Sequence, residues 1–150
     1  MKFFLLIILL AIFVLVAIAF YLYFLYKKKL FEDLDYIAKY LKNNITFNKN
    51  NINILLTNAF KDINPTSKYI LKNLSSPISK LFFRKDKNIV NDFYKSLGKG
   101  DVNFEVSNLN YYIEIFEELK KKHSEEMKSK AMVYFKLIIG FGLTLCIILI

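Results

Sequence analysis

Two long apolar stretches lie near the ends of the chain, and a polar region separates them. Residues 3–26 contain no charged side chain, and residues 131–150 contain one, Lys136. About 20 consecutive apolar residues are enough for a helix to cross the bilayer core. A lysine near the end of such a helix can extend its ammonium group back to the interface. The pattern predicts a membrane anchor at 1–26, a helical domain at 27–130 and a second membrane helix at 131–150.

The first apolar stretch is too long for a cleaved signal peptide. The apolar core of a signal peptide has about 7 to 15 residues and precedes a small-residue cleavage site. Here the stretch ends in bulky side chains and then Lys27, Lys28 and Lys29. We therefore expect an uncleaved anchor.

The lysines beside the membrane helices predict their orientation. Three lysines follow the first helix directly, whereas only Lys2 precedes it. Basic residues are enriched on the cytoplasmic side of membrane helices. We therefore expect a multi-pass protein of the cell membrane with its central domain in the cytoplasm and both termini, including Ile150, outside.

Apolar residues recur at steps of three and four on both sides of the central domain. Such spacing places side chains on one face of a helix, which must pack against a partner. The predicted fold is all-α, with two transmembrane helices continuing into a small antiparallel cytoplasmic helical bundle. In this pairing Glu32, Asp33 and Asp35 would face Lys120 to Lys122, with Asp35 and Lys121 as the pair for a charge-swap test, and Asn43 or Asn44 would end the first helix. The expected helix-pair contacts are Leu30, Leu34, Leu41, Leu109, Phe116 and Leu119.

The middle of the chain reads as several short helices. Asn50 or Asn51, the Asn64–Pro65 pair and Pro77 are typical helix-start residues. In the helix that begins near Pro77, we expect the apolar side to hold Ile78, Leu81 and Phe82. Among the neighbouring aromatic pairs, the expected core residues are Phe82, Phe83, Tyr111 and Tyr112.

Glycines mark two further positions. Leu97, Gly98 and Asp101 form a break in which Gly98 can adopt a left-handed helix cap and Asp101 can accept the free N–H groups of the next helix. From Val102 onward we expect one helix that runs to the end of the chain. Gly140 and Gly142 lie inside the second apolar stretch, where small residues permit close helix packing in lipid.

The residues that could support catalysis are few. His123 is the only histidine and Cys146 the only cysteine. No phosphate-binding glycine loop or spaced carboxylate pair is present, so we expect no catalytic residue, no cofactor, no metal and no enzyme activity. The net charge is +9. Because no nucleic-acid-binding motif accompanies it, anionic lipid is the expected basic-surface partner rather than nucleic acid.

The Leu97, Gly98 and Asp101 break, followed by a long helix with a glycine-containing membrane end, resembles the stage III sporulation protein AB family. The segment after the first membrane helix, YKKKLFEDLDYIAKYLKNNITF, lies where that family has its first cytoplasmic helix. Family members usually carry glutamine four residues after the aspartate, where this chain has Glu105. The middle of this chain is also short for the family.

The resemblance implies a membrane component of the channel between mother cell and forespore. The family's soluble domain resembles the cytoplasmic domain of the type II secretion inner-membrane platform protein. The resemblance therefore implies, as partners, a cytoplasmic secretion-type ATPase on the mother-cell side and other membrane proteins of the sporulation channel. The resemblance does not decide whether the chain also forms a homo-oligomer.

Two other classes fit the bare pattern. A small accessory subunit of a membrane transporter or enzyme would carry a buried polar group in a span, for which Lys136 is the candidate. A pore former would need an amphipathic span, and neither apolar stretch has that pattern.

Overall fold

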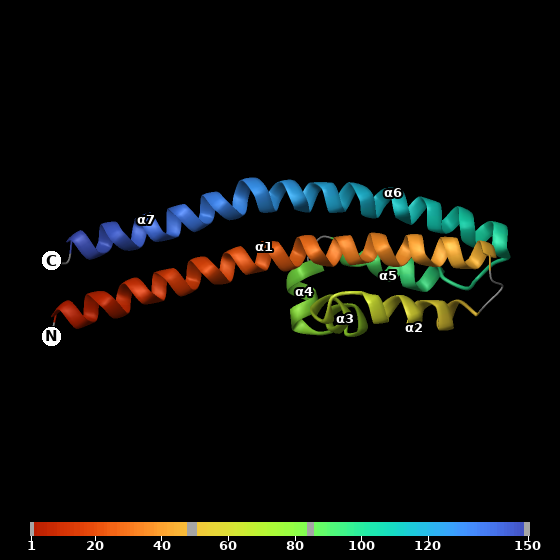
Figure 1. Cartoon of the computed structure of the whole chain (residues 1–150), viewed down its shortest axis with the longest axis horizontal. Helices are drawn as coiled ribbons and strands as arrows, with labels where there is room; N and C mark the ends of the chain where they lie inside the picture. Colours follow the sequence, from red (N-terminus) through yellow and green to blue (C-terminus); the bar gives the residue numbers. More distant parts are fainter. Residues whose placement is uncertain (1, 48–50, 84–85, 149–150) are drawn as a thin grey trace. The chain divides into compact units, whose positions relative to one another are not determined.

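The computed structural model describes residues 2–47, 51–83 and 86–148, and every regular element in those ranges is helical (Figure 1). This confirms the all-α prediction. The elements are α1 (Lys2–Phe47), α2 (Ile52–Asp62), α3 (Pro65–Lys72), α4 (Pro77–Phe83), α5 (Lys87–Ser96), α6 (Val102–Glu126), a π-helix (Met127–Ala131) and α7 (Met132–Ile148). The placement of Ile150 lies outside the described residues.

The chain divides into two compact units. One comprises Met1–Lys28 with Lys122–Ile150, and the other comprises Lys29–Lys121. We call them the membrane unit and the soluble unit. This division groups residues by their contacts and does not test the predicted boundaries of the segments 1–26, 27–130 and 131–150, which stay predictions.

Helix α1 continues further than the sequence predicted. It runs to Phe47, so Asn43 and Asn44 lie inside the helix and do not end it. The side-chain amide of Asn44 donates to the carbonyl oxygen of Tyr40 at 2.8 Å, four residues earlier. This bond lets an asparagine, usually a helix terminator, remain within the last turns.

The short helices begin where the sequence predicted. The side chain of Asn51 accepts a hydrogen bond from Asn53 N at 3.0 Å, and that of Asn64 accepts one from Thr66 N at 2.9 Å. Each bond satisfies a backbone N–H that the first turn of a helix leaves free. Pro65 then occupies the first position of α3, where its fixed φ favours the helix.

The inner face of α4 differs from the prediction. Ile78 and Leu81 are 47% and 59% exposed, whereas Ser79 and Phe83 are fully buried. The Ser79 hydroxyl donates to Ile70 O of α3 at 2.8 Å, and the Phe83 ring packs edge-on against Phe31 of α1 at 6.0 Å. Because Ser79 and Phe83 face the other helices, the side of α4 that carries Ile78 and Leu81 faces the surface.

Aromatic residues of α5 and α6 pack against one another in the core of the soluble unit. The ring of Phe93 on α5 lies 5.2 Å from Tyr112 and 5.1 Å from Phe116, both on α6. The prediction that Tyr111 belongs to this core is wrong, because its side chain is 59% exposed. The predictions for Phe82, Phe83 and Tyr112 are confirmed, since all three are buried.

The membrane unit pairs the beginning of α1 with α7. Phe13 lies beside Phe141, Phe20 and Phe24 lie beside Tyr134, and Tyr21 lies beside Phe135. Rising numbers on one helix meet falling numbers on the other, so the two segments run antiparallel here. Both helices are long and apolar enough to cross a membrane.

The single helix expected after Val102 is interrupted. Residues Met127–Ala131 form a π-helix between α6 and α7. A π-helical turn inserts one extra residue into an α-helix and turns the residues beyond it onto a new face. The sequence pattern gave no sign of this turn.

Candidate functional site

The turn between α5 and α6 is built around Gly98, which has φ +77°. Glycine adopts this left-handed conformation without the penalty that a Cβ atom imposes on other residues. A Cβ atom at Gly98 would also lie 3.1 Å from Ile52 Cγ2. Leu97 before it has extended backbone and ends α5.

Two carboxylates fix the backbone that follows Gly98, between the turn and the first residues of α6. Asp101 Oδ1 accepts a hydrogen bond from Phe104 N at 2.8 Å, in the manner of a helix N-cap. Glu105 Oε1 accepts from Lys99 N at 2.8 Å and from Gly100 N at 3.1 Å. Because Glu105 is buried and reaches back to two backbone donors, it holds the chain between the helices in one conformation.

The outer surface of this turn is mixed in character. Lys99, Gly100 and Asp101 are exposed. The ring of Phe104 is 54% exposed and lies so close to Gly100 that an added Cβ atom would meet it at 2.3 Å. We define Lys99–Phe104 as the turn surface. It presents an aromatic ring and a lysine on a rigid support, which suits contact with another protein.

Ion pairs join α1 to α6 within the soluble unit. Lys120 Nζ lies 2.5 Å from Asp35 Oδ2, and Lys39 Nζ lies 2.6 Å from Glu117 Oε1 and 2.9 Å from Asp35 Oδ1. Hydrogen bonds to Glu117 and Asp35 raise the pKa of Lys39. The lysine that meets Asp35 is Lys120, which is one of the three lysines expected beside it. Lys121, the lysine chosen for the charge-swap test, is exposed.

All six leucine and phenylalanine residues predicted to join the two long helices are buried. Burial does not identify the residue that each one touches, so the individual helix-pair contacts and the antiparallel order of the whole bundle stay predictions. The residues are Leu30, Leu34, Leu41, Leu109, Phe116 and Leu119.

His123 takes part in a small charged cluster at the start of the π-helix. Its Nδ1 lies 2.9 Å from Glu126 Oε2, and Lys130 Nζ lies 2.8 Å from Glu126 Oε1. Burial raises the pKa of Glu126, but the hydrogen bonds from Lys130 and His123 outweigh it and hold the pKa at about 2. Glu126 is thus a carboxylate at neutral pH, bonded to His123 in α6 and to Lys130 within the π-helix.

The two glycines of α7 have different surroundings. A Cβ atom on Gly142 would lie 2.8 Å from Phe13 Cγ, so this glycine lets α7 approach the first span closely. A Cβ atom on Gly140 would meet nothing within 4 Å. The sequence could not separate the two, since both lie in the same apolar run.

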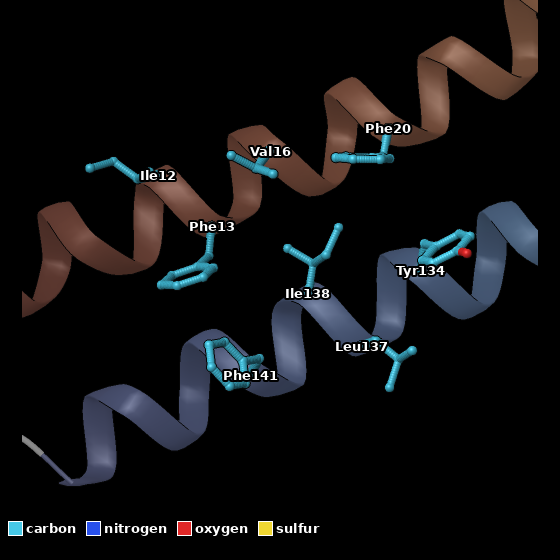
Figure 2. Close-up of a pocket in the computed structure, with 8 residues that line it drawn as sticks. All are labelled: Ile12, Phe13, Val16, Phe20, Tyr134, Leu137, Ile138 and Phe141. Atoms are coloured by element: carbon cyan, nitrogen blue, oxygen red, sulfur yellow. The ribbon is translucent and has the colours of Figure 1, made fainter.

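A hollow of about 520 Å³ opens beside this helix pair (Figure 2). Figure 2 shows Phe13 of α1 and Ile138 of α7 pointing toward the opposite helix. Its walls are apolar except for the hydroxyl of Tyr134, so only an apolar group such as an acyl chain fits it. The lining residues are Ile12, Phe13, Val16, Phe20, Tyr134, Leu137, Ile138 and Phe141.

Among residues 2–47, 51–83 and 86–148, no three His, Cys, Asp or Glu side chains gather in a way that could hold a metal ion. Cys146 lies in α7, with its sulfur 3.9 Å from Leu6 O. The expectation that the chain is not an enzyme stays a prediction.

Glu105 is the residue whose role sequence reasoning missed, and for Gly142 the sequence did not show how it differs from Gly140. Glu105 carries a weak signal, since an acidic residue one turn after an N-cap can reach back to the preceding backbone. The role of Gly142 depends on which residue of the other span it faces. Periodicity within α7 does not contain that information.

Comparison with known proteins gives one match. Residues 79–150 match the model of the family described as stage III sporulation protein AB (spore_III_AB). The matched region begins in α4 and includes the glycine turn, α6 and α7. No curated protein and no solved structure matches the chain. The match confirms the family recognised from the sequence.

Proposed function

We propose that this chain, whose residues 79–150 match the stage III sporulation protein AB family, has a role in stage III of sporulation and acts there as a membrane platform. The platform belongs to the channel between mother cell and forespore. Its cytoplasmic domain docks a secretion-type ATPase. The observation that carries this proposal is the family match across the glycine turn and the closing apolar helix.

We place the chain in the cell membrane by its two apolar helices. Each is long and apolar enough to span a bilayer, and the polar soluble unit lies between them in the sequence. The three lysines at 27–29 favour a cytoplasmic soluble unit and external termini. In this topology the soluble unit lies on the mother-cell side, where ATP and its hydrolysing partner are present.

We assign the docking point to the turn surface, Lys99–Phe104. Gly98 and Glu105 hold its backbone in one conformation, so a partner would meet a preformed surface and lose little entropy on binding. Phe104 offers an exposed ring that a pocket on the partner can bury. The soluble unit itself needs no catalytic group for this role.

Affinity purification tests the proposal. A tagged full-length chain would be expressed in its sporulating host, crosslinked, extracted from membranes and analysed by mass spectrometry. We expect a secretion-type ATPase and membrane proteins of the sporulation channel with the wild-type chain. We expect Phe104→Ala to lose the ATPase and keep the membrane proteins. The exposed α2 variant Lys61→Ala serves as the matched control.

Recovery of an unrelated transporter or enzyme without an ATPase would replace this proposal with the accessory-subunit alternative. That alternative calls for a buried polar group within a span. Lys136, its candidate, is exposed on α7, so the structure gives no observation in its favour.

A further inference from the structure

The soluble unit has two exposed faces of opposite charge. Between Pro65 and Phe83, in α3 and α4, the chain has three lysines and no acidic residue. Between Val102 and Leu119, in α6, it has four glutamates and no basic residue. Of those glutamates only Glu105 is buried. This segregation exists within one small folded unit.

Each face also exposes apolar side chains. On α3 and α4, Tyr69, Ile78 and Leu81 are exposed beside Lys72 and Lys80. We call these five residues the basic face. On α6, Tyr111 is 59% exposed, and Glu114 and Glu118 are also exposed. Glu114 lies three residues after Tyr111 and Glu118 four residues after Glu114, which places all three on one side of the helix. We call these three residues the acidic face.

The two faces lie on opposite sides of α1. Phe83 of α4 packs against Phe31 of α1, whereas Lys120 and Glu117 of α6 contact Asp35 and Lys39 of α1. Within the soluble unit, Figure 1 shows α6 along one side of α1 and α3 and α4 along the other. A single chain therefore cannot bring its own two faces together.

We propose that the basic face of one copy binds the acidic face of the next copy of this chain. The lysines of the basic face are opposite in charge to the glutamates of the acidic face, and every copy carries both faces. This complementarity favours a second copy of the chain over an unrelated protein. Tyr111 supplies an exposed ring to lie against Ile78 and Leu81. Contact between two different faces is heterologous, so it propagates from copy to copy.

This inference rests on the proposed membrane location but not on ATPase docking. Two spans hold every copy in the same orientation relative to the bilayer, so repeated contacts are related by rotation about the membrane normal. The copies close into a ring when the rotation angle between neighbours is a whole fraction of 360°. A platform for a channel would then be an assembly of several copies.

Cysteine crosslinking in membranes tests this assembly. The full-length chain would carry Cys146→Ala, and a short bis-maleimide would be added to membranes of a non-sporulating host that lacks the ATPase. We expect no dimer from Tyr111→Cys alone or Leu81→Cys alone, a dimer from the two co-expressed, and a ladder of products from the double variant. Lys61→Cys in place of Leu81→Cys provides the control.

Charge reversal distinguishes a specific contact from collision. Glu114→Lys with Glu118→Lys, or Lys72→Glu with Lys80→Glu, should each lower the ladder about tenfold, since two favourable pairs become repulsive. Combining both reversals in one chain should restore it, which also shows that the variants fold and insert.

Three results would overturn the inference. A dimer from either single cysteine variant would show that identical faces meet. Absence of products from the mixed variants, with normal amounts of protein in the membrane, would show that copies do not associate through these faces. Crosslinking of Leu81→Cys to a different protein alone would assign the basic face to that partner. Each result leaves ATPase docking at Lys99–Phe104 untouched.

Discussion

Gly98 is the residue whose backbone most constrains the turn between α5 and α6. At φ +77°, any L-residue other than glycine is strained, and asparagine is the least strained of the others. We expect Gly98→Val to lower the free energy of unfolding by about 1–2 kcal/mol or more and Gly98→Asn to lose clearly less. Thermal unfolding of the detergent-solubilised full chain, followed by circular dichroism, measures both. Equal losses would show that φ is not the cause.

Glu105 supports the same turn through a single oxygen. Oε1 accepts two backbone N–H groups, and a glutamine Oε1 can do the same. We therefore expect Glu105→Gln to retain most of the stability. Glu105→Ala should lose about 1–3 kcal/mol, because it removes the acceptor of two part-buried backbone hydrogen bonds. The same unfolding measurement compares them, and an alanine variant as stable as the glutamine variant would contradict this role.

Predictions from sequence at the residue scale succeeded where the relevant bond is local. Asn51 and Asn64 cap helices through atoms two residues away, so their spacing contains the whole interaction. Ile78 and Leu81 were assigned to the wrong side, because the inner face of α4 is chosen by Ile70 and Phe31 in other helices. A helix of seven residues has too little pattern to reveal that choice.

Helices α1 and α6 are joined by the buried carboxylate of Asp35. We expect Lys120→Asp to destabilise the chain by about 1–3 kcal/mol, because it places a like charge beside Asp35. Asp35→Lys combined with Lys120→Asp should recover part of the loss. Lys121→Asp, on the exposed side, is the control. Unfolding of the four chains forms a double-mutant cycle. A double variant no better than the singles would argue against this register.

The packing of α7 against the first span depends on Gly142. Leucine there would meet Phe13, whereas leucine at Gly140 would enter open space. Cys146 lies near Leu6 O, so Leu6→Cys offers a partner for a disulfide between the spans. We expect Gly142→Leu to lower its yield about tenfold, as overpacking costs about 1–3 kcal/mol. Gly140→Leu should leave the yield unchanged, and equal effects would refute the distinction.

At the element scale, periodicity predicted the long helices and left their local irregularity undetected. Leu109, Phe116 and Leu119 are buried in α6, as their spacing requires. The π-helix at Met127–Ala131 has ordinary helix-forming residues. The π-helix begins directly after Glu126, whose carboxylate bonds to His123 three residues earlier and to Lys130 four residues later. Such a turn depends on packing and ion pairs that a single sequence does not display.

For the whole molecule, composition and hydropathy predicted an all-helical chain with two apolar helices, and the structure has that content. The family recognised from the glycine break and the closing helix matches residues 79–150. The two units group residues by their contacts, so the predicted boundaries at 1–26, 27–130 and 131–150 stay predictions. The surfaces of the soluble unit did not follow from sequence, because exposure of Tyr111 and Leu81 is decided by tertiary packing.

The most direct test of the platform proposal is site-specific photocrosslinking in sporulating cells. A photoreactive phenylalanine analogue would replace Phe104, and a matched chain would carry it at Lys61 on α2. The account predicts a covalent product between position 104 and a secretion-type ATPase during stage III, with none from position 61. A chain present at normal levels that gives no ATPase product from position 104 would contradict the docking of the ATPase on this turn.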